Sequence, residues 1–122
     1  MYDYRENVKA DAKDYIISNY EIDELLANRE SMESELYDEM WTADSVTGNG
    51  SGSYTFSTYE AEENLLHNWD LLVEAANEFG CEPIISDGYE NGPEFWDVTI
   101  RCYLLSEAIS EALDEIEADQ EA

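Results

Sequence analysis

Four stretches of the chain place hydrophobic residues at the three- and four-residue spacing of an amphipathic helix. They cover residues 3–18, 22–40, 58–79 and 94–118. The third has the best-marked ends, because Ser57 and Glu60 fit a capping box and Gly80 fits a left-handed residue after a helix. The pattern therefore predicts a mostly α-helical chain with four helices.

The fourth stretch allows a second interpretation over part of its length. Seven hydrophobic residues recur there by three and four without a miss, which favours a helix with a heptad-like stripe: Phe95, Val98, Cys102, Leu105, Ile109, Ala112 and Ile116. Over residues 97–103, however, Val98, Ile100 and Cys102 also alternate with polar residues, as in a strand. We prefer the helix for residues 97–103 and keep the strand as an alternative.

The same periodicity predicts which large side chains are buried. On the third helix, Trp69 and Phe79 share the apolar face with Leu65 and Leu72. Trp41 and Trp96 fall at the edges of their stripes. We therefore expect Trp69 in the core, and Trp41 and Trp96 partly exposed.

Two loops separate these helices. Residues 42–53, TADSVTGNGSGS, form a long Gly-rich loop, and residues 54–56 after it favour a short extended piece. Residues 81–94 contain both prolines, with a second extended piece expected at residues 84–85. The expected fold is one domain over residues 1–122, with four helices and up to two short strands.

Charge changes this picture most. The chain has 31 Asp and Glu against 5 Lys and Arg, a formal net charge of -26, yet 43% of it is hydrophobic and 12% aromatic. Disordered acidic chains lack such hydrophobic content, so we expect a folded protein. Like charges destabilise a compact state, which suggests selection for a basic partner or for solubility. The signs are also separated: Arg5, Lys9 and Lys13 form one stripe, and 24 acids but one base follow from Glu30 onward.

Acidic residues form rows on the second, third and fourth helices. Carboxylates four residues apart on a helix are roughly 6 Å apart, similar to the spacing of phosphates along a nucleic-acid strand. Such rows are usually solvated faces, but at this net charge they are candidates for binding a basic partner. The candidate residues are Glu35, Asp38, Glu39, Glu63, Asp70, Glu74, Glu78, Glu107, Glu111, Asp114 and Glu115.

Residues for catalysis or cofactor binding are not recognisable. A single histidine, His67, allows no catalytic triad, and the cysteines Cys81 and Cys102 are expected to be free thiols. No cofactor and no dedicated metal site is expected, weak binding of divalent cations at acidic clusters being the one alternative. No apolar run reaches the length of a membrane span, and no signal peptide is recognisable, so a cytoplasmic protein is expected.

Residues 41–56, WTADSVTGNGSGSYTF, together with residues 60–65, EAEENL, resemble a family of small acidic uncharacterised proteins of bacterial phages and mobile elements. That resemblance implies no particular activity and assigns no functional residue. In its size and charge the chain is also similar to the anti-restriction and anti-CRISPR proteins that mimic nucleic acid.

Two hypotheses follow. The first is a stoichiometric inhibitor, not an enzyme, that mimics DNA and blocks the basic groove of a nuclease or effector complex, such as a CRISPR-Cas effector or restriction enzyme. It would bind no nucleic acid itself, because its charge opposes that. The alternative is a structural or adaptor protein of a phage or mobile element that forms a homodimer through the stripe of the fourth helix.

Overall fold

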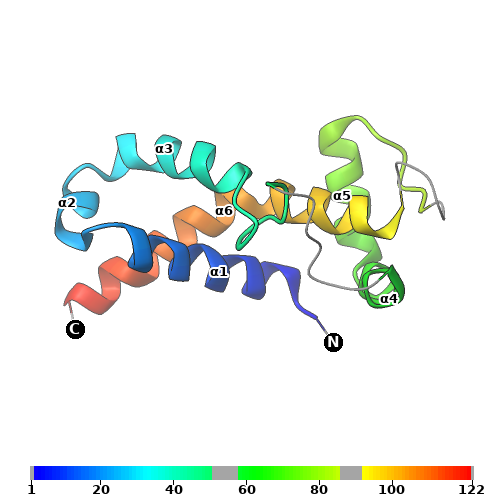
Figure 1. Cartoon of the computed structure of the whole chain (residues 1–122), viewed down its shortest axis with the longest axis horizontal. Helices are drawn as coiled ribbons and strands as arrows, with labels where there is room; N and C mark the ends of the chain where they lie inside the picture. Colours follow the sequence, from blue (N-terminus) through cyan, green and yellow to red (C-terminus); the bar gives the residue numbers. More distant parts are fainter. Residues whose placement is uncertain (1, 51–57, 86–91, 122) are drawn as a thin grey trace.

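Six helices account for most of the described chain (Figure 1). The computed structural model describes residues 2–50, 58–85 and 92–121. The helices are α1 (Tyr4–Asn19), α2 (Ile22–Ala27), α3 (Arg29–Trp41), α4 (Thr58–His67), α5 (Trp69–Phe79) and α6 (Pro93–Glu121). The prediction of a mostly α-helical fold is confirmed.

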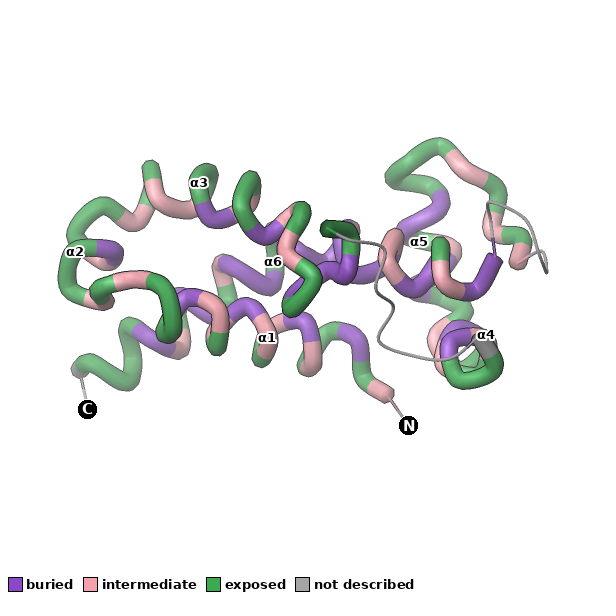
Figure 2. Tube along the Cα trace, in the orientation of Figure 1, coloured by how far each residue is buried: buried purple, intermediate pink, exposed green. Residues whose placement is uncertain are grey.

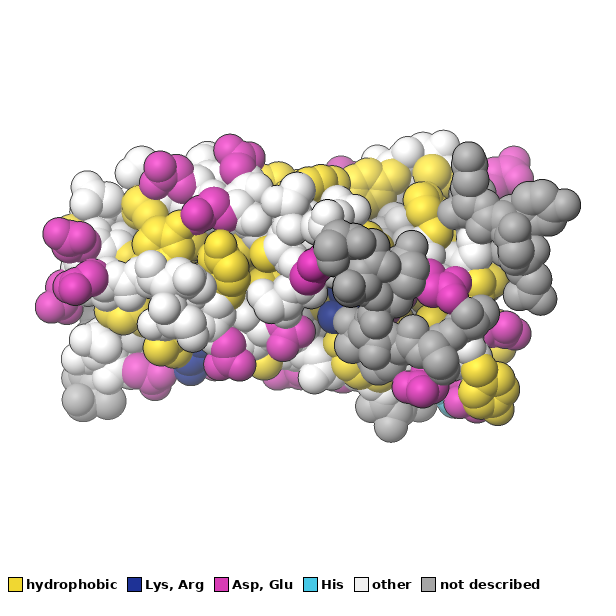
Figure 3. Space-filling model, viewed as in Figure 1, with side chains coloured by type: hydrophobic (Ala, Val, Ile, Leu, Met, Phe, Trp, Pro, Cys, Tyr) yellow, Lys and Arg dark blue, Asp and Glu magenta, His cyan; other side chains and the backbone are white. Residues whose placement is uncertain are grey.

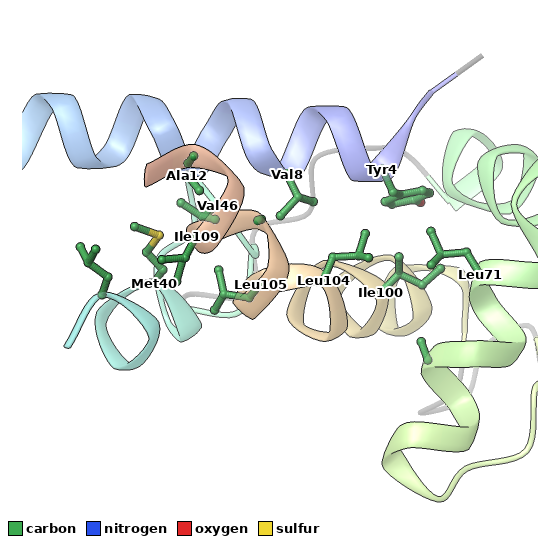
Figure 4. Packing of buried hydrophobic residues seen from close by; sticks show 14 of the residues in the cluster. Tyr4, Val8, Ala12, Met40, Val46, Leu71, Ile100, Leu104, Leu105 and Ile109 are labelled. Atoms are coloured by element: carbon green, nitrogen blue, oxygen red, sulfur yellow. The ribbon is translucent and has the colours of Figure 1, made fainter. Parts of the chain in front are cut away.

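Helix α6 is the centre of the fold, because each of the other five helices contacts it. It lies along most of the long axis of the molecule, with α1 parallel to it and α3 antiparallel (Figure 1). On α1, every fourth residue is buried, namely Tyr4, Val8, Ala12 and Ile16. Several of these side chains point toward Ile100, Leu104, Leu105 and Ile109 of α6 (Figure 4). Figure 2 shows the buried positions following the inward sides of these helices.

The prediction of four helices is wrong, because two of the expected helices are each divided at an asparagine. Asn28 separates α2 from α3, and Asn68 separates α4 from α5. In both places the side-chain amide donates to the carbonyl oxygen four residues earlier, Asn28 to Glu24 at 3.1 Å and Asn68 to Asn64 at 2.7 Å. Such bonds compete with the backbone ladder of a helix. Both asparagines have similar non-helical torsions, with ψ values of 31° and 35°.

Residues 97–103 lie within α6, so the strand interpretation is wrong and the helix is confirmed. Within the described ranges there is no strand, and residues 84–85 belong to no regular element. The other expected extended piece, residues 54–56, lies outside the described residues, as does the end of the Gly-rich loop.

The observed burial of several aromatic side chains differs from the prediction. Trp69 is 41% exposed and Phe79 42%, so their predicted burial is wrong. Phe95, at the start of the α6 stripe, is 36% exposed. Trp96, expected to be partly exposed, is fully buried, and its indole N–H donates to the Ile84 carbonyl oxygen at 2.8 Å. Trp41 is partly exposed, as predicted.

The loop after α3 contributes to the core and closes that helix. Val46 and Thr47 are fully buried. The Thr47 hydroxyl lies 3.0 Å from the Trp41 carbonyl oxygen and 3.3 Å from that of Met40, which gives hydrogen-bonding partners to the end of α3. At Gly50 a side chain would collide with the Thr42 carbonyl oxygen, so only glycine fits there.

One charged pair is buried inside the fold. Asp97 and Arg101 are each 2% exposed, and the Arg101 Nε lies 3.3 Å from the Asp97 carboxylate. The Tyr4 hydroxyl donates to the same carboxylate at 2.8 Å, and the Arg101 guanidinium lies over the rings of Tyr2 and Tyr4. Burial raises the pKa of the Asp97 carboxyl, although Arg101 and the Tyr4 hydroxyl favour its charged form. The group therefore joins the N-terminus of α1 to α6.

Candidate partner-binding surface

All five basic side chains of the protein lie in ion pairs within the molecule. The stripe on α1 faces acids of α6: Arg5 lies 2.9 Å from Glu107, Lys9 3.0 Å from Glu115, and Lys13 3.2 Å from Asp119. These pairs advance in the same direction along both helices, as parallel packing requires. The hydrogen bond from Lys9 lowers the pKa of Glu115.

Arg29 connects the start of α3 to α6 in the same way. It lies 2.7 Å from Asp114 and 2.8 Å from Glu117, and it also donates to the Ser110 carbonyl oxygen at 3.2 Å. Arg101 completes the set in the buried pair with Asp97. The bases of α1 and Arg29 of α3 therefore lie against acidic residues of α6. Each of the five bases is held in an ion pair.

The candidate carboxylates fall into three groups. Four of the eleven, Glu74, Glu107, Asp114 and Glu115, take part in these ion pairs. Glu63 accepts a hydrogen bond from Tyr59 at 3.2 Å. The remaining six are exposed, and within the described part of the chain no ion pair involves them: Glu35, Asp38, Glu39, Asp70, Glu78 and Glu111. Acidic side chains are distributed along the length of the face that Figure 3 shows.

The row expected along the third helix is not continuous. Glu63 lies on α4, whereas Asp70, Glu74 and Glu78 lie on α5. Figure 1 shows α4 nearly end-on and α5 from the side, so the two helices point in different directions. The break at Asn68 therefore divides that row, and three of its four carboxylates remain together.

A groove along α6 brings some of these carboxylates together. It consists of three hollows of about 550, 260 and 190 Å³ that share lining residues. Tyr37 and Ser106 line the first and second, and Phe79 and Cys102 line the second and third. We call the three together the α6 groove. Its floor is α6 from Phe95 to Ser110, and its walls are α3 and the C-terminal end of α5.

The two ends of the α6 groove differ in character. The end near the start of α6 is apolar and is lined by Trp41, Phe79, Phe95 and Val98. The other end carries Glu33 and Asp38, and Glu78 lies between the two. No basic side chain lines any of the three hollows. Figure 3 shows hydrophobic side chains along the upper edge of the molecule, between α3 and α5.

Sequence reasoning located Asp38 and Glu78 but missed the groove between them. The hydrophobic pattern predicted burial of Phe79 and assigned Phe95 to the apolar stripe of the fourth helix, and it gave Glu33 and Tyr103 no role. The one available signal was the aromatic content near the loop ends, since aromatic residues often anchor partners.

Other chemistry finds little support at this surface. Among the described residues, no group of three or more His, Cys, Asp or Glu side chains is placed to hold a metal ion. Cys81 and Cys102 are both free, and burial raises the pKa of the Cys102 thiol to about 11. None of the helices in the described ranges combines the length and the apolar character needed to cross a bilayer.

Comparisons with protein-family models, with curated proteins and with solved structures give no match for this chain.

Proposed function

We propose that this protein is a stoichiometric inhibitor that mimics DNA and occupies the basic groove of a nucleic-acid-binding defence protein, such as a CRISPR-Cas effector or a restriction enzyme. The observation that carries the proposal is the density of charge along the molecule. Helix α6 has 29 residues, so it is about 43 Å long. A DNA duplex of that length carries about 25 negative charges, and the protein carries a net charge of -26.

The ion pairs support the same proposal. Since all five Lys and Arg side chains are held in ion pairs within the molecule, none of them is left unpaired to repel a basic surface. The unpaired carboxylates lie on α3, α5 and α6, so negative charge is presented along the whole molecule. A groove built to neutralise phosphates would attract such a surface at long range, and added salt would weaken that attraction.

Inhibition in this scheme is competition and involves no chemical step. The exposed carboxylates set the association rate and its salt dependence, and the aromatic side chains set the lifetime of the complex. Action in the cytoplasm, where such effectors meet DNA, belongs to the same proposal.

The adaptor alternative depends on an accessible apolar stripe on α6, and most of that stripe is buried. Within the stripe of α6, the residues from Cys102 to Ile116 are buried inside this chain, against α1 and α3. Of this stripe only Phe95 and Val98 are accessible, which favours the inhibitor over a homodimer that forms through α6.

The test is a titration of the purified protein against an RNA-guided nuclease and a restriction endonuclease at low salt. DNA binding and DNA cleavage are measured separately, with excess Mg²⁺ present so that weak chelation does not imitate inhibition. We expect one class of effector to lose DNA binding at a protein-to-effector ratio near one. If micromolar protein leaves binding and cleavage by both effectors unchanged, the proposal is wrong.

Matched triple variants locate the face that acts. Glu35→Gln, Asp38→Asn and Glu39→Gln together remove three candidate charges, whereas Asp23→Asn, Glu24→Gln and Glu30→Gln remove three exposed charges outside the candidate set. We expect the first set to weaken inhibition more than the second. Equal effects would mean that total charge matters and that these particular carboxylates do not.

A further inference from the structure

The α6 groove has the length and the lining of a site for a helix. Its floor runs from Phe95 to Ser110, which is about 22 Å along α6, or roughly the length of a 15-residue helix. It is apolar at one end and acidic at the other. A grooved surface of this kind takes the apolar face of an amphipathic helix.

The backbone argues for a helix over an extended peptide. One common way for an extended segment to bind is to add a strand to a sheet edge, which satisfies its backbone hydrogen bonds. The described part of this chain has no strand and therefore no such edge. A helix satisfies its backbone groups internally, so it needs only side-chain contacts from the groove.

Charge then selects the occupant. Glu33, Asp38 and Glu78 flank the α6 groove, and no Lys or Arg side chain lines it. Glu33 is paired with Arg29 at 3.8 Å, so Asp38 and Glu78 are the flanking carboxylates without an ion pair among the described residues. A second copy of this chain would bring another charge of -26 to the same place, which opposes a homodimer. The flanks instead complement Lys and Arg on either side of an apolar stripe.

We propose that the α6 groove binds a basic amphipathic helix of the partner protein, with apolar anchors against Phe79 and Phe95 and basic residues toward Asp38 and Glu78. This inference rests on the proposed function for its basic partner and adds how that partner is held. Phe79 and Phe95 are suited to this role because both are exposed aromatic side chains, a type enriched in binding hot spots.

The probe is a fluorescent peptide of about 18 Leu, Lys and Ala residues, with leucines at i, i+4, i+7 and i+11 and lysines on the flanks. Its control isomer has the same residues, with the leucines distributed around the helix. Fluorescence anisotropy at about 150 mM salt measures binding of both. We expect the amphipathic peptide to bind about tenfold more tightly than its isomer.

Two double variants test the aromatic anchors. Phe79→Ala with Phe95→Ala removes them, and Ile17→Ala with Leu66→Ala removes two exposed apolar side chains outside the groove. We expect the first variant to abolish the preference for the amphipathic peptide and the second to keep it. Thermal unfolding of each variant confirms that both remain folded.

Two further variants test the acidic flanks. Asp38→Asn with Glu78→Gln and Glu35→Gln with Asp70→Asn each remove two exposed charges, and only the first pair touches the groove. We expect the first pair to weaken binding by about threefold relative to the second.

The outcomes separate this inference from the proposed function. If both peptides bind equally, or both double Ala variants lose binding equally, the helix site is wrong and the competition with DNA is unaffected. If neither peptide binds even at low salt, the helix site is also wrong. If the amphipathic peptide binds in the groove but no effector is inhibited, the helix site holds and the proposed function is wrong.

Discussion

Asp97 and Arg101 are the most deeply buried charged side chains among the described residues. A buried ion pair contributes little net stability, because removing two charges from water costs about as much as their attraction returns. Losing one partner is different, because the other charge is then left in an apolar setting. At the residue scale, this pair therefore makes Arg101 and Asp97 dependent on each other.

We predict that Arg101→Leu lowers the free energy of unfolding by about 3–5 kcal/mol. Adding Asp97→Asn should recover a substantial part of that loss, because the carboxylate charge is gone while the amide oxygen still accepts from Tyr4. Urea unfolding of the two single variants and the double variant measures the coupling. Strictly additive losses would contradict this view of the pair.

Asn68 has a larger structural role than its position within a helical pattern suggests. Its side chain donates to Asn64 on α4 and also to the Tyr2 carbonyl oxygen at 3.3 Å. It therefore fixes the bend between α4 and α5 and holds the segment before α1 against that bend. Asn28 makes the corresponding bond to Glu24 but is exposed.

At the element scale we predict that Asn68→Ala destabilises the protein by about 1 kcal/mol, since two hydrogen bonds are lost. Asn28→Ala serves as the matched control. It should be nearly neutral, because one exposed bond is lost and the helix propensity of alanine offsets it. Urea unfolding measures both, and a larger loss at Asn28 would contradict the prediction.

The two breaks also explain what the sequence could predict. Hydrophobic spacing found α1 and α6 well, because Tyr4, Val8, Ala12 and Ile16 repeat without interruption. It missed the breaks because Asn28 and Asn68 are single residues within otherwise regular stripes. Once α5 begins at Trp69 in a new direction, that side chain no longer shares a face with Leu65, and its predicted burial fails.

The candidate surface was predictable in part for a similar reason. Carboxylates on helix faces can be located from spacing alone, and the exposure of Glu35, Asp38 and Glu39 required only the stripe of α3. The α6 groove depends on how α3, α5 and α6 pack against one another, and helical spacing in a single sequence does not predict that packing. The ion pairs between the α1 bases and the α6 acids likewise could not be predicted, because they depend on the parallel packing of those two helices.

At the scale of the whole molecule, the net charge of -26 destabilises the folded state through repulsion between carboxylates. We predict that raising NaCl from about 50 to 500 mM increases the thermal midpoint by about 5 °C, because salt screens the repulsion between carboxylates. Salt also weakens the exposed ion pairs of α1, but each such pair contributes only about 0–1 kcal/mol. KCl should give the same rise, and a midpoint that falls with either salt would contradict the prediction.

The same repulsion predicts an unusual dependence on pH. Burial raises the pKa values of Asp97 and Asp11 above their ordinary value of 3.8. The native state therefore holds these protons more strongly than the unfolded state does, so their contribution to stability increases as the pH falls through that range. Acidification also lowers the negative charge of the whole chain. Glu115 acts in the opposite sense, because its pKa is lowered from 4.5, but its contribution is lost only below that value.

We therefore expect the thermal midpoint to rise as the pH is lowered from 7 to about 5, where many proteins show little change or a loss. Scanning calorimetry at several pH values measures it. The rise should shrink at high salt, because screening removes the repulsion, and Asp97→Asn should reduce the part that remains. A midpoint that falls steadily from pH 7 to 5 would mean that ion pairs such as Lys9 with Glu115 outweigh the repulsion, and the charge of this protein would then stabilise its fold.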